Sequence, residues 1–272
     1  MRSVKIKEVI DALERFAPLP LQEEYDNAGL QVGLTEAEVS GALLCLDVTE
    51  RVVDEAITKG CNLIVAHHPL IFRKLSQVTD ANYVQRTVIK AIKNDIVIVA
   101  MHTNLDAAFG GVNFKIAEKL GLRDVRFFGR EKVVTNPLTD KKVTGGDGVI
   151  GCFDTPLAAD DLILLLKKEF DVECVQANEL LRREIRTVAL CGGSGSFLLQ
   201  DAINAGADAF ITGEMGYHEF FGHEQEIQLC VIGHYQSEQY TTAVLRDVIE
   251  HDCPGVKCCI SEINTNPIVY FS

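Results

Sequence analysis

The chain has 272 residues, of which 47% are hydrophobic and 24% are charged, so it can bury a sizeable core as one large domain or two closely packed ones. The net charge of −13 disfavours binding to a nucleic-acid backbone, and no lysine- or arginine-rich stripe offsets it. No apolar run approaches the ~20 residues of a membrane span, and the N-terminus lacks the apolar region of a signal peptide, so we expect a cytoplasmic protein with no membrane partner.

Strands and helices alternate in the first part of the chain. Apolar periodicity predicts helices over residues 4–16, 48–59, 82–94 and 112–120, with Gly60 and Gly121 as C-caps of the second and fourth. Short apolar runs predict strands over residues 42–46, 63–67 and 96–100, and a further short strand lies within 24–33. The alternation is typical of an α/β protein with parallel strands.

The remainder is predicted as a connecting segment and a second lobe. Turn residues over 123–148 indicate β-hairpins, followed by a helix over 162–170 and a short strand over 174–177. Strands are predicted over 188–191, 209–212 and 229–232, one long helix over 237–251, and closing strands over 256–260 and 267–271. We therefore expect an α/β fold with mixed sheets, made of an N-terminal lobe (1–122), a connecting segment (123–187) and a C-terminal lobe (188–272) that pack as one unit.

Two adjacent histidines end the strand over residues 63–67. Leu63-Ile-Val-Ala66 reads as a strand buried on both faces, and Pro69 stops it directly after His67 and His68. Ligands of open α/β sheets bind at the carboxyl ends of strands, and histidine is the commonest protein ligand for zinc-like metals. From this pair alone, a metal site and a polar strand end fit equally well.

The two halves of the chain read alike, which favours the metal. Without a gap, Cys45 aligns with Cys191, Gly60 with Gly206 and His68 with Glu214. Further on, His102-Thr-Asn-Leu-Asp106 matches His234-Tyr-Gln-Ser-Glu238. Such a register indicates two βαβ-type repeats, with chance similarity between two such units as the alternative.

Polar donors then follow the ends of four strands. They are His67 and His68, Asp106, Glu214, and His234 with Glu238. If the two lobes pack edge to edge, three imidazoles and two carboxylates converge in one cleft, which suits a dinuclear site with a bridging carboxylate. His102 fits a role in the second shell around such a site or that of a satisfied polar core residue. His218 and His223 are expected at the surface, and His251 at a helix end.

Two other features leave their roles open. The glycine-rich residues 192–196 fit an anion-binding turn or a simple tight turn, and they lack the lysine of a Walker loop. The chain has nine cysteines and no Cys-x-x-Cys pair, so we expect reduced thiols. Cys253, Cys258 and Cys259 lie close together but lack histidines at a zinc-site spacing.

Taken together, these motifs resemble the GTP cyclohydrolase I type 2 homologue family, also known as the NGG-one-interacting-factor-three-like proteins. The resemblance spans nearly the whole chain and rests on five segments in order: residues 26–33, 67–72, 102–106, 191–195 and 233–238. It implies a two-lobed α/β fold with a dinuclear metal site in the cleft between the lobes. It also implies a homohexamer and the ligands His67, His68, Asp106, His234 and Glu238, with Glu238 bridging.

The resemblance implies a metal-dependent hydrolase in which an activated water attacks purine C8 of GTP and formate is released. The same chemistry could cleave a phosphoester, so the substrate class is a small molecule, with nucleotides the first to consider. Imidazole and carboxylate donors suit zinc, iron, manganese or cobalt. The alternative is a non-catalytic metal-binding regulator or protein-interaction scaffold.

Overall fold

The computed structural model describes residues 3–271, which form two compact units. The first unit comprises the chain up to Leu105, residues 135–142 and everything from Thr241 onward, and the second comprises residues 106–134 and 143–240. The chain passes between these units at 105/106, 134/135, 142/143 and 240/241, whereas the sequence analysis placed the lobe boundaries at 122/123 and 187/188. The hairpin tip and the last long helix belong to the first unit, and residues 106–122 and most of the expected connecting segment belong to the second.

The sheet of the first unit has the strand order β1-β4-β3-β2-β11. Its strands are β1 (Gly29–Val32), β2 (Ala42–Cys45), β3 (Leu63–Ala66), β4 (Val97–Ala100) and β11 (Cys258–Ile260). The last four are parallel, and β1 runs antiparallel to β4. Every residue of β2, β3 and β4 is buried, as expected for parallel strands covered on both faces.

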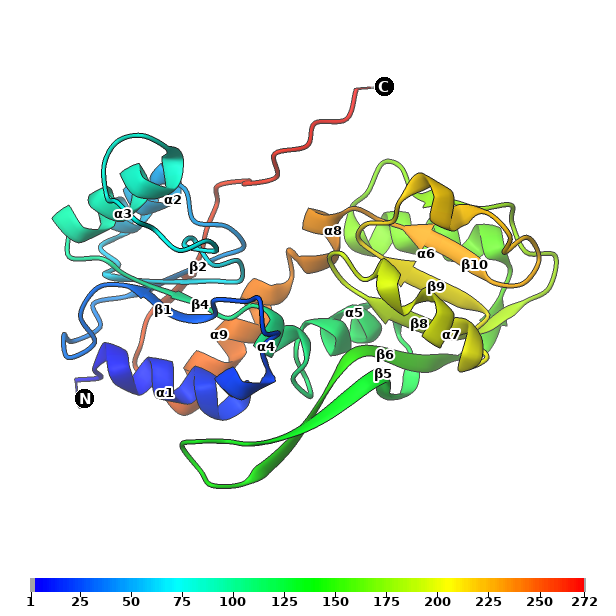
Figure 1. Cartoon of the computed structure of the whole chain (residues 1–272), viewed down its shortest axis with the longest axis horizontal. Coiled ribbons are helices and arrows are strands. Elements are labelled where there is room, and N and C mark those ends of the chain that lie inside the picture. Colours follow the sequence, from blue (N-terminus) through cyan, green and yellow to red (C-terminus); the bar gives the residue numbers. More distant parts are fainter. Residues whose placement is uncertain (1–2, 272) are drawn as a thin grey trace. The chain divides into compact units, whose positions relative to one another are not determined.

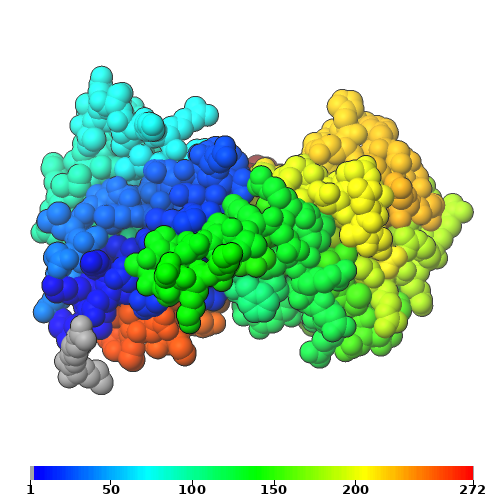
Figure 2. Space-filling model, turned by 60° about the horizontal axis from the view of Figure 1, so that its bottom comes forward, coloured from blue at the N-terminus to red at the C-terminus, as the bar shows by residue number. Residues whose placement is uncertain are grey.

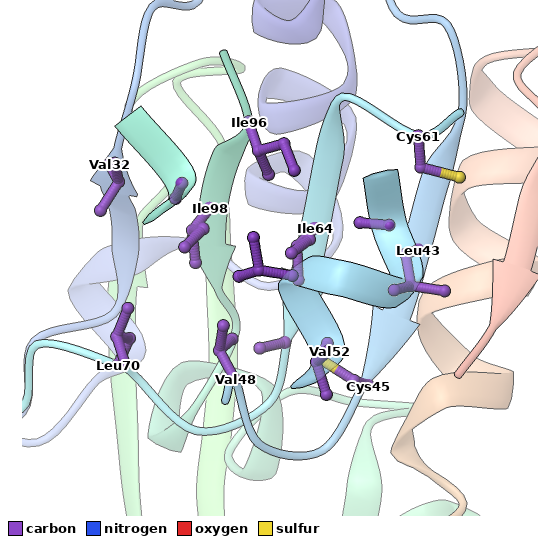
Figure 3. Close-up of a cluster of buried hydrophobic side chains, with 14 of the residues drawn as sticks. Val32, Leu43, Cys45, Val48, Val52, Cys61, Ile64, Leu70, Ile96 and Ile98 are labelled. Atoms are coloured by element: carbon purple, nitrogen blue, oxygen red, sulfur yellow. The ribbon is translucent and has the colours of Figure 1, made fainter. Parts of the chain in front are cut away.

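Helices cover both faces of this sheet. Figure 1 shows α2 (Glu50–Lys59) and α3 (Tyr83–Lys93) on one side, and α1 (Ile6–Phe16) and α9 (Thr241–Asp252) on the other. The side chains between the sheet and α2 and α3 form one apolar cluster, which includes Ile64 and Ile98 from neighbouring strands and Val52 of α2 (Figure 3). This packing fixes the ends of β3 and β4 against each other.

The sheet of the second unit has the strand order β5-β6-β8-β9-β10-β7. Its strands are β5 (Arg123–Thr135), β6 (Lys142–Leu157), β7 (Gln176–Ala177), β8 (Ile185–Cys191), β9 (Ala209–Thr212) and β10 (Gln228–Val231). Strands β8, β9 and β10 are parallel, and β7 runs antiparallel to β10. The helices are α5 (Val112–Leu120), α6 (Ala159–Phe170), α7 (Leu199–Asn204) and α8 (His234–Glu238), with the 3-10 turns η2 (Ser196–Leu198) and η3 (Tyr217–Phe220).

The long hairpin of β5 and β6 ends in a tip that packs on α1. The Asn136 amide donates hydrogen bonds to the carbonyl oxygens of Glu14 and Arg15, at 3.2 and 3.1 Å. Figure 2 shows this green tip lying over the blue N-terminal segment. Capping of the α1 C-terminus thus assigns the tip to the first unit.

The two units repeat one arrangement, in agreement with the ungapped alignment of the two halves. Cys45 pairs in register with Ala66 on the neighbouring strand, and the aligned Cys191 pairs with Thr212. Gly60 and Gly206 both adopt a left-handed conformation, with φ of 68° and 72°, where the helix between the strands ends. In each unit an antiparallel strand also pairs with the third of three consecutive parallel strands: β1 pairs with β4, and β7 pairs with β10.

Two predicted elements are wrong. The helix expected over 237–251 is two helices, α8 and α9, separated at Gln239 and Tyr240, whose side chains donate to the carbonyl oxygens of Phe170 and Glu169 at 3.2 and 3.1 Å. These tertiary bonds turn the chain where the sequence periodicity continues. Residues 267–271 form no strand, and Figure 1 shows this segment extending away from the sheet. Within residues 3–271, no helix combines the length and the apolar character that crossing a membrane requires.

Candidate metal-binding half-sites

Three histidines meet at the carboxyl edge of the first sheet. His67 and His68 directly follow β3, and His102 follows β4, its parallel neighbour. The ring centroids lie 4.9 Å (His67–His68), 5.3 Å (His67–His102) and 5.4 Å (His68–His102) apart. One ring nitrogen from each lies within 4.8 Å of those of the other two, which is a candidate metal-ligand group. We call this cluster the first half-site.

Each of these imidazoles is oriented through its Nδ1 atom. Nδ1 of His67 lies 2.8 Å from the Met101 carbonyl oxygen, that of His68 lies 2.8 Å from Asp47 Oδ1, and that of His102 lies 2.7 Å from Asp26 Oδ1. A carbonyl or carboxylate oxygen can only accept, so Nδ1 carries the proton and Nε2 carries the lone pair. Metal-binding histidines in proteins are oriented in this way, with the second nitrogen bonded to a carbonyl or a carboxylate.

The two supporting carboxylates are themselves held in place. Burial alone would raise the pKa of Asp26, but hydrogen bonding and charge from His102, and the Thr103 hydroxyl, lower it to about 2. Burial likewise opposes ionisation of Asp47, yet His68 and the Thr265 hydroxyl hold its pKa below the usual value. Thr265 donates to Asp47 Oδ2 at 2.6 Å. Both groups are therefore anions that fix imidazole orientation.

The second half-site comprises side chains of α8 and side chains that follow strands β8 and β9. His234 and Glu238 are one turn apart on α8, with His234 Nε2 3.0 Å from Glu238 Oε2. His234 Nδ1 lies 2.9 Å from Glu214 Oε1, and Ser194 Oγ donates to Glu214 Oε2 at 2.6 Å. The hydrogen bond from Ser194, followed by the charge of His234, keeps the pKa of Glu214 low although burial opposes this. Glu214 thus supports His234 as Asp26 supports His102.

The glycine-rich turn at residues 192–196 positions this second half-site. Gly192, Gly193 and Gly195 donate their backbone N–H groups to side-chain oxygens of Asn113, Ser237 and Thr212, at 2.9, 2.9 and 3.1 Å. Three of the amides are thus engaged within the protein, which favours a structural turn over an anion-binding one. Gly193 has φ +58°, and a Cβ atom there would collide with the Glu238 carboxylate. Glycine is therefore required where the backbone passes the glutamate.

Asp106 ends α4 (Thr103–Asp106), and its carboxylate lies on the same side of the second unit as that of Glu238. Burial, followed by the negative charges of Asp106, Glu238 and Asp147, raises the pKa of the Cys191 thiol. The Asp106 carbonyl oxygen also accepts a hydrogen bond from the Asn113 amide at 3.2 Å. Cys191 therefore stays a neutral thiol beneath two of the candidate ligands.

The remaining histidines and the C-terminal cysteines lie outside these clusters. His218 is exposed, while His223 and His251 contact the carboxylates of Glu226 and Asp252 at 3.0 and 2.7 Å, consistent with the expected peripheral roles. All nine cysteines are free thiols, and the candidate metal-ligand groups among residues 3–271 contain none of them.

Sequence reasoning missed three residues that support the histidines: Asp47, Thr265 and Ser194. Asp47 follows the buried strand β2 at the same sheet edge as His68, a signal the sequence did contain. The pairing of Asp47 with Thr265 joins residues far apart in the sequence and left no local pattern. Glu214 was recognised as a strand-end donor, and the structure gives it the role of orienting His234.

The fold and the oriented histidines describe an α/β protein with candidate metal-ligand groups of histidine and glutamate. Residues 4–267 match the family Duf34/NIF3 (NGG1p interacting factor 3), and the chain belongs to this family. Relatives named GTP cyclohydrolase 1 type 2 homolog include one from Clostridium acetobutylicum, 32% identical over 91% of this chain and 90% of its own length. One from Clostridium perfringens is 35% identical over 86% of this chain and 87% of its own length.

Solved structures agree with this assignment. A Bacillus cereus protein related to NIF3 superposes with a TM-score of 0.86 at 25% identity, with both chains fully covered. A Staphylococcus aureus hypothetical protein gives 0.88 at 28% identity, covering 99% of this chain and 100% of its own.

Proposed function

We propose that the protein is a hydrolase that uses two divalent metal ions, held by His67, His68, Asp106, His234 and Glu238, with Glu238 bridging the pair. The observation that carries the proposal is the common orientation of the imidazoles of His67, His68 and His234, each held through Nδ1, with Nε2 of His234 facing the carboxylate of Glu238. Neither half-site alone supplies all of these ligands, so the proposal requires both to serve the same pair of ions. The donor set suits zinc, iron, manganese or cobalt.

A bound pair of divalent cations lowers the pKa of water and stabilises negative charge that develops on the substrate. The residues of the chain would orient the metal ligands and accept a proton. Asp47 and Glu214 would hold a proton on Nδ1 of His68 and of His234, which leaves Nε2 of each ring to bind a metal. We assign His102 as the group that takes the proton released by the attacking water, because its Nε2 adjoins the cluster and Asp26 would stabilise the resulting imidazolium.

An experiment can distinguish His102 as a proton acceptor from His102 as a further metal ligand. General acid–base catalysis typically contributes ~10²–10⁴-fold to the rate. We expect His102→Gln to keep both metals while turnover falls by about that factor. Loss of a metal from this variant would make His102 a ligand instead. His223→Gln is the matched control, because His223 also contacts a glutamate through Nδ1 but lies outside the candidate groups.

The first substrate to test is GTP, because the relatives carry the name GTP cyclohydrolase 1 type 2 homolog. The decisive experiment is elemental analysis of the purified protein together with formate release from GTP. Two metals per chain and formate production that stops on chelation would support the hydrolase. Two metals without formate would leave the metal site standing and direct the search to phosphoesters and other nucleotides. Absence of metal after reconstitution would refute the proposal.

A non-catalytic role is the second candidate, and the interaction named in the family description favours it. In that case the metals would stabilise a scaffold, and no small-molecule substrate would turn over. The predicted homohexamer and cytoplasmic location belong to both candidates. The mass of the native assembly by light scattering tests the hexamer, since any mass other than six chains contradicts it.

A further inference from the structure

An exposed strip next to the first half-site combines two aromatic rings with two cations. Its members are Tyr25, Phe72, Arg73 and Lys74, which we call the aromatic–cationic strip. Tyr25 and Phe72 are 68% and 46% exposed, although burial of such rings is favourable, and Arg73 and Lys74 are exposed as well. The mechanism above uses none of these four residues.

The strip is held at a defined distance from the histidines. The Phe72 ring contacts the His102 ring edge-on, with centroids 6.2 Å apart and planes at 86°, and the Tyr25 ring lies 6.4 Å from that of Phe72. Tyr25 directly precedes Asp26, the carboxylate that orients His102. The Phe72 ring therefore adjoins a side chain of the first half-site, and the Tyr25 ring adjoins Phe72.

Hydrogen bonds of Asn27 and Gln31 to the backbone of Ile71 keep the strip in place. The Asn27 side chain donates to the Ile71 carbonyl oxygen at 2.6 Å, and the Ile71 N–H group donates to Gln31 Oε1 at 3.1 Å. Gln31 also donates to the Asn27 carbonyl oxygen at 2.7 Å. These bonds fix the backbone close to each of the two rings, so that a ligand would meet a preformed surface.

Arg73 and Lys74 have no partner carboxylate in the part of the chain that the structure describes. Among residues 3–271, neither Arg73 nor Lys74 forms an ion pair or a side-chain hydrogen bond, whereas the chain carries 39 acidic side chains. In a protein with a net charge of −13, two adjacent cations without acidic partners mark a local site for an anion.

We propose that the strip binds a nucleoside phosphate, with the base against Phe72 and Tyr25 and the phosphates at Arg73 and Lys74. Aromatic side chains bind nucleobases by stacking, and cations bind phosphate oxygens, so the combination fits a planar ring that carries an anion. A ligand held there would lie beside His102. The inference deepens the proposed hydrolase by naming the surface that selects its substrate class, and it rests on that function for the fate of the bound ligand.

Binding can be measured without turnover. We would use 7-deaza-GTP, whose altered five-membered ring prevents the cyclohydrolase reaction, and inorganic tripolyphosphate, which lacks a base, in calorimetric titrations of the purified, metal-containing protein. Phe72→Ala should weaken 7-deaza-GTP binding about tenfold, as expected for loss of one stacking contact. Tripolyphosphate binding and metal content should not change, and Phe72→Tyr should retain most of the affinity.

The cations give the complementary result. The double substitution Arg73→Ala with Lys74→Ala should weaken binding of both 7-deaza-GTP and tripolyphosphate. The difference in affinity from the unsubstituted protein should shrink as the salt concentration is raised. Matched controls are Phe221→Ala, another exposed aromatic residue, and Lys141→Ala with Lys142→Ala, another adjacent exposed pair of cations. Neither control should change either affinity.

Unchanged 7-deaza-GTP affinity in Phe72→Ala would overturn the inference. A changed assembly mass with unchanged affinity would also overturn it and would identify the strip as a contact between copies of the chain. The outcome is distinct from failure of the proposed function: Phe72-dependent binding without formate release from GTP would refute the cyclohydrolase and leave the nucleotide surface standing.

Discussion

The two half-sites occupy equivalent places in two repeated units, yet they are built differently. The first presents three imidazoles, supported by Asp26, Asp47 and a backbone carbonyl. The second presents one imidazole and the Glu238 carboxylate, and the position aligned with His68 is Glu214, which supports His234 rather than standing beside it as a second imidazole. Both units thus present polar side chains at the same edge of the sheet, but aligned positions differ in role: His68 is a candidate ligand, and Glu214 orients one.

This comparison predicts its largest effect at Glu238, the one residue proposed to contact both metals. Glu238→Ala should lose both ions, because no other carboxylate in the proposed set bridges them, and the fold should persist. Elemental analysis and circular dichroism measure these two outcomes. Two equivalents of metal in the variant would contradict the assignment, and Glu226→Ala, which removes a glutamate next to an unrelated histidine, is the control.

The next effect is expected at Gly193, because the second half-site depends on its backbone. Gly193→Ala places a side chain at φ +58° and against the Glu238 carboxylate. The left-handed conformation alone costs ~1–2 kcal/mol, and displacement of Glu238 should also reduce metal content. Chemical unfolding and elemental analysis measure the two effects. Gly206→Ala is the control: it has φ +72° but open space around Cβ, so it should lose stability and retain metal.

Substitution of the supporting carboxylates tests whether both half-sites rely on oriented imidazoles. Asp47→Asn and Glu214→Gln should each weaken metal binding by ~10–100-fold, the usual effect of removing such a partner. Ser194→Ala should have a smaller effect, because it removes one bond to Glu214 and leaves the carboxylate in place. Competition with a chromophoric chelator gives the affinities, and equal affinity in all three variants and the parent protein would show that orientation contributes nothing.

The smallest effect is a pH dependence of stability from Asp26. Its pKa of about 2 lies below the ordinary aspartate value, so the folded state favours the ionised form. This stabilisation is present above pH ~4 and is lost as the pH falls toward 2, and its full size is about 2 kcal/mol. For chelator-treated protein, the difference in unfolding free energy between the parent and Asp26→Asn should therefore shrink from pH 5 to pH 3. A constant difference would contradict the assigned pKa.

The comparison also shows which parts of the site a sequence can predict. The positions of His67 and His234 after strand ends could be predicted from the sequence. Short apolar runs stop there at polar residues, and local burial determines where each strand ends. The hydrogen bonds that orient the imidazoles could not be predicted in this way, because the Asp26–His102 and Asp47–Thr265 bonds join residues far apart in the chain. The break between α8 and α9 was missed for the same reason: Gln239 and Tyr240 are turned by bonds to the distant α6. The proposed sharing of metals between the half-sites stays a prediction.

The bond between Thr265 and Asp47 has a consequence for synthesis of the protein. His68 and Asp47 leave the ribosome early, but the hydroxyl that holds Asp47, and the edge strand β11 beside β2, come from residues that are translated much later. Chains are made from the N-terminus, so the nascent first unit has its histidines long before it has the means to orient them. If His68 is a metal ligand as proposed, tight binding there requires Thr265 to have been translated, and an ion that arrives earlier would meet an imidazole that is not yet oriented.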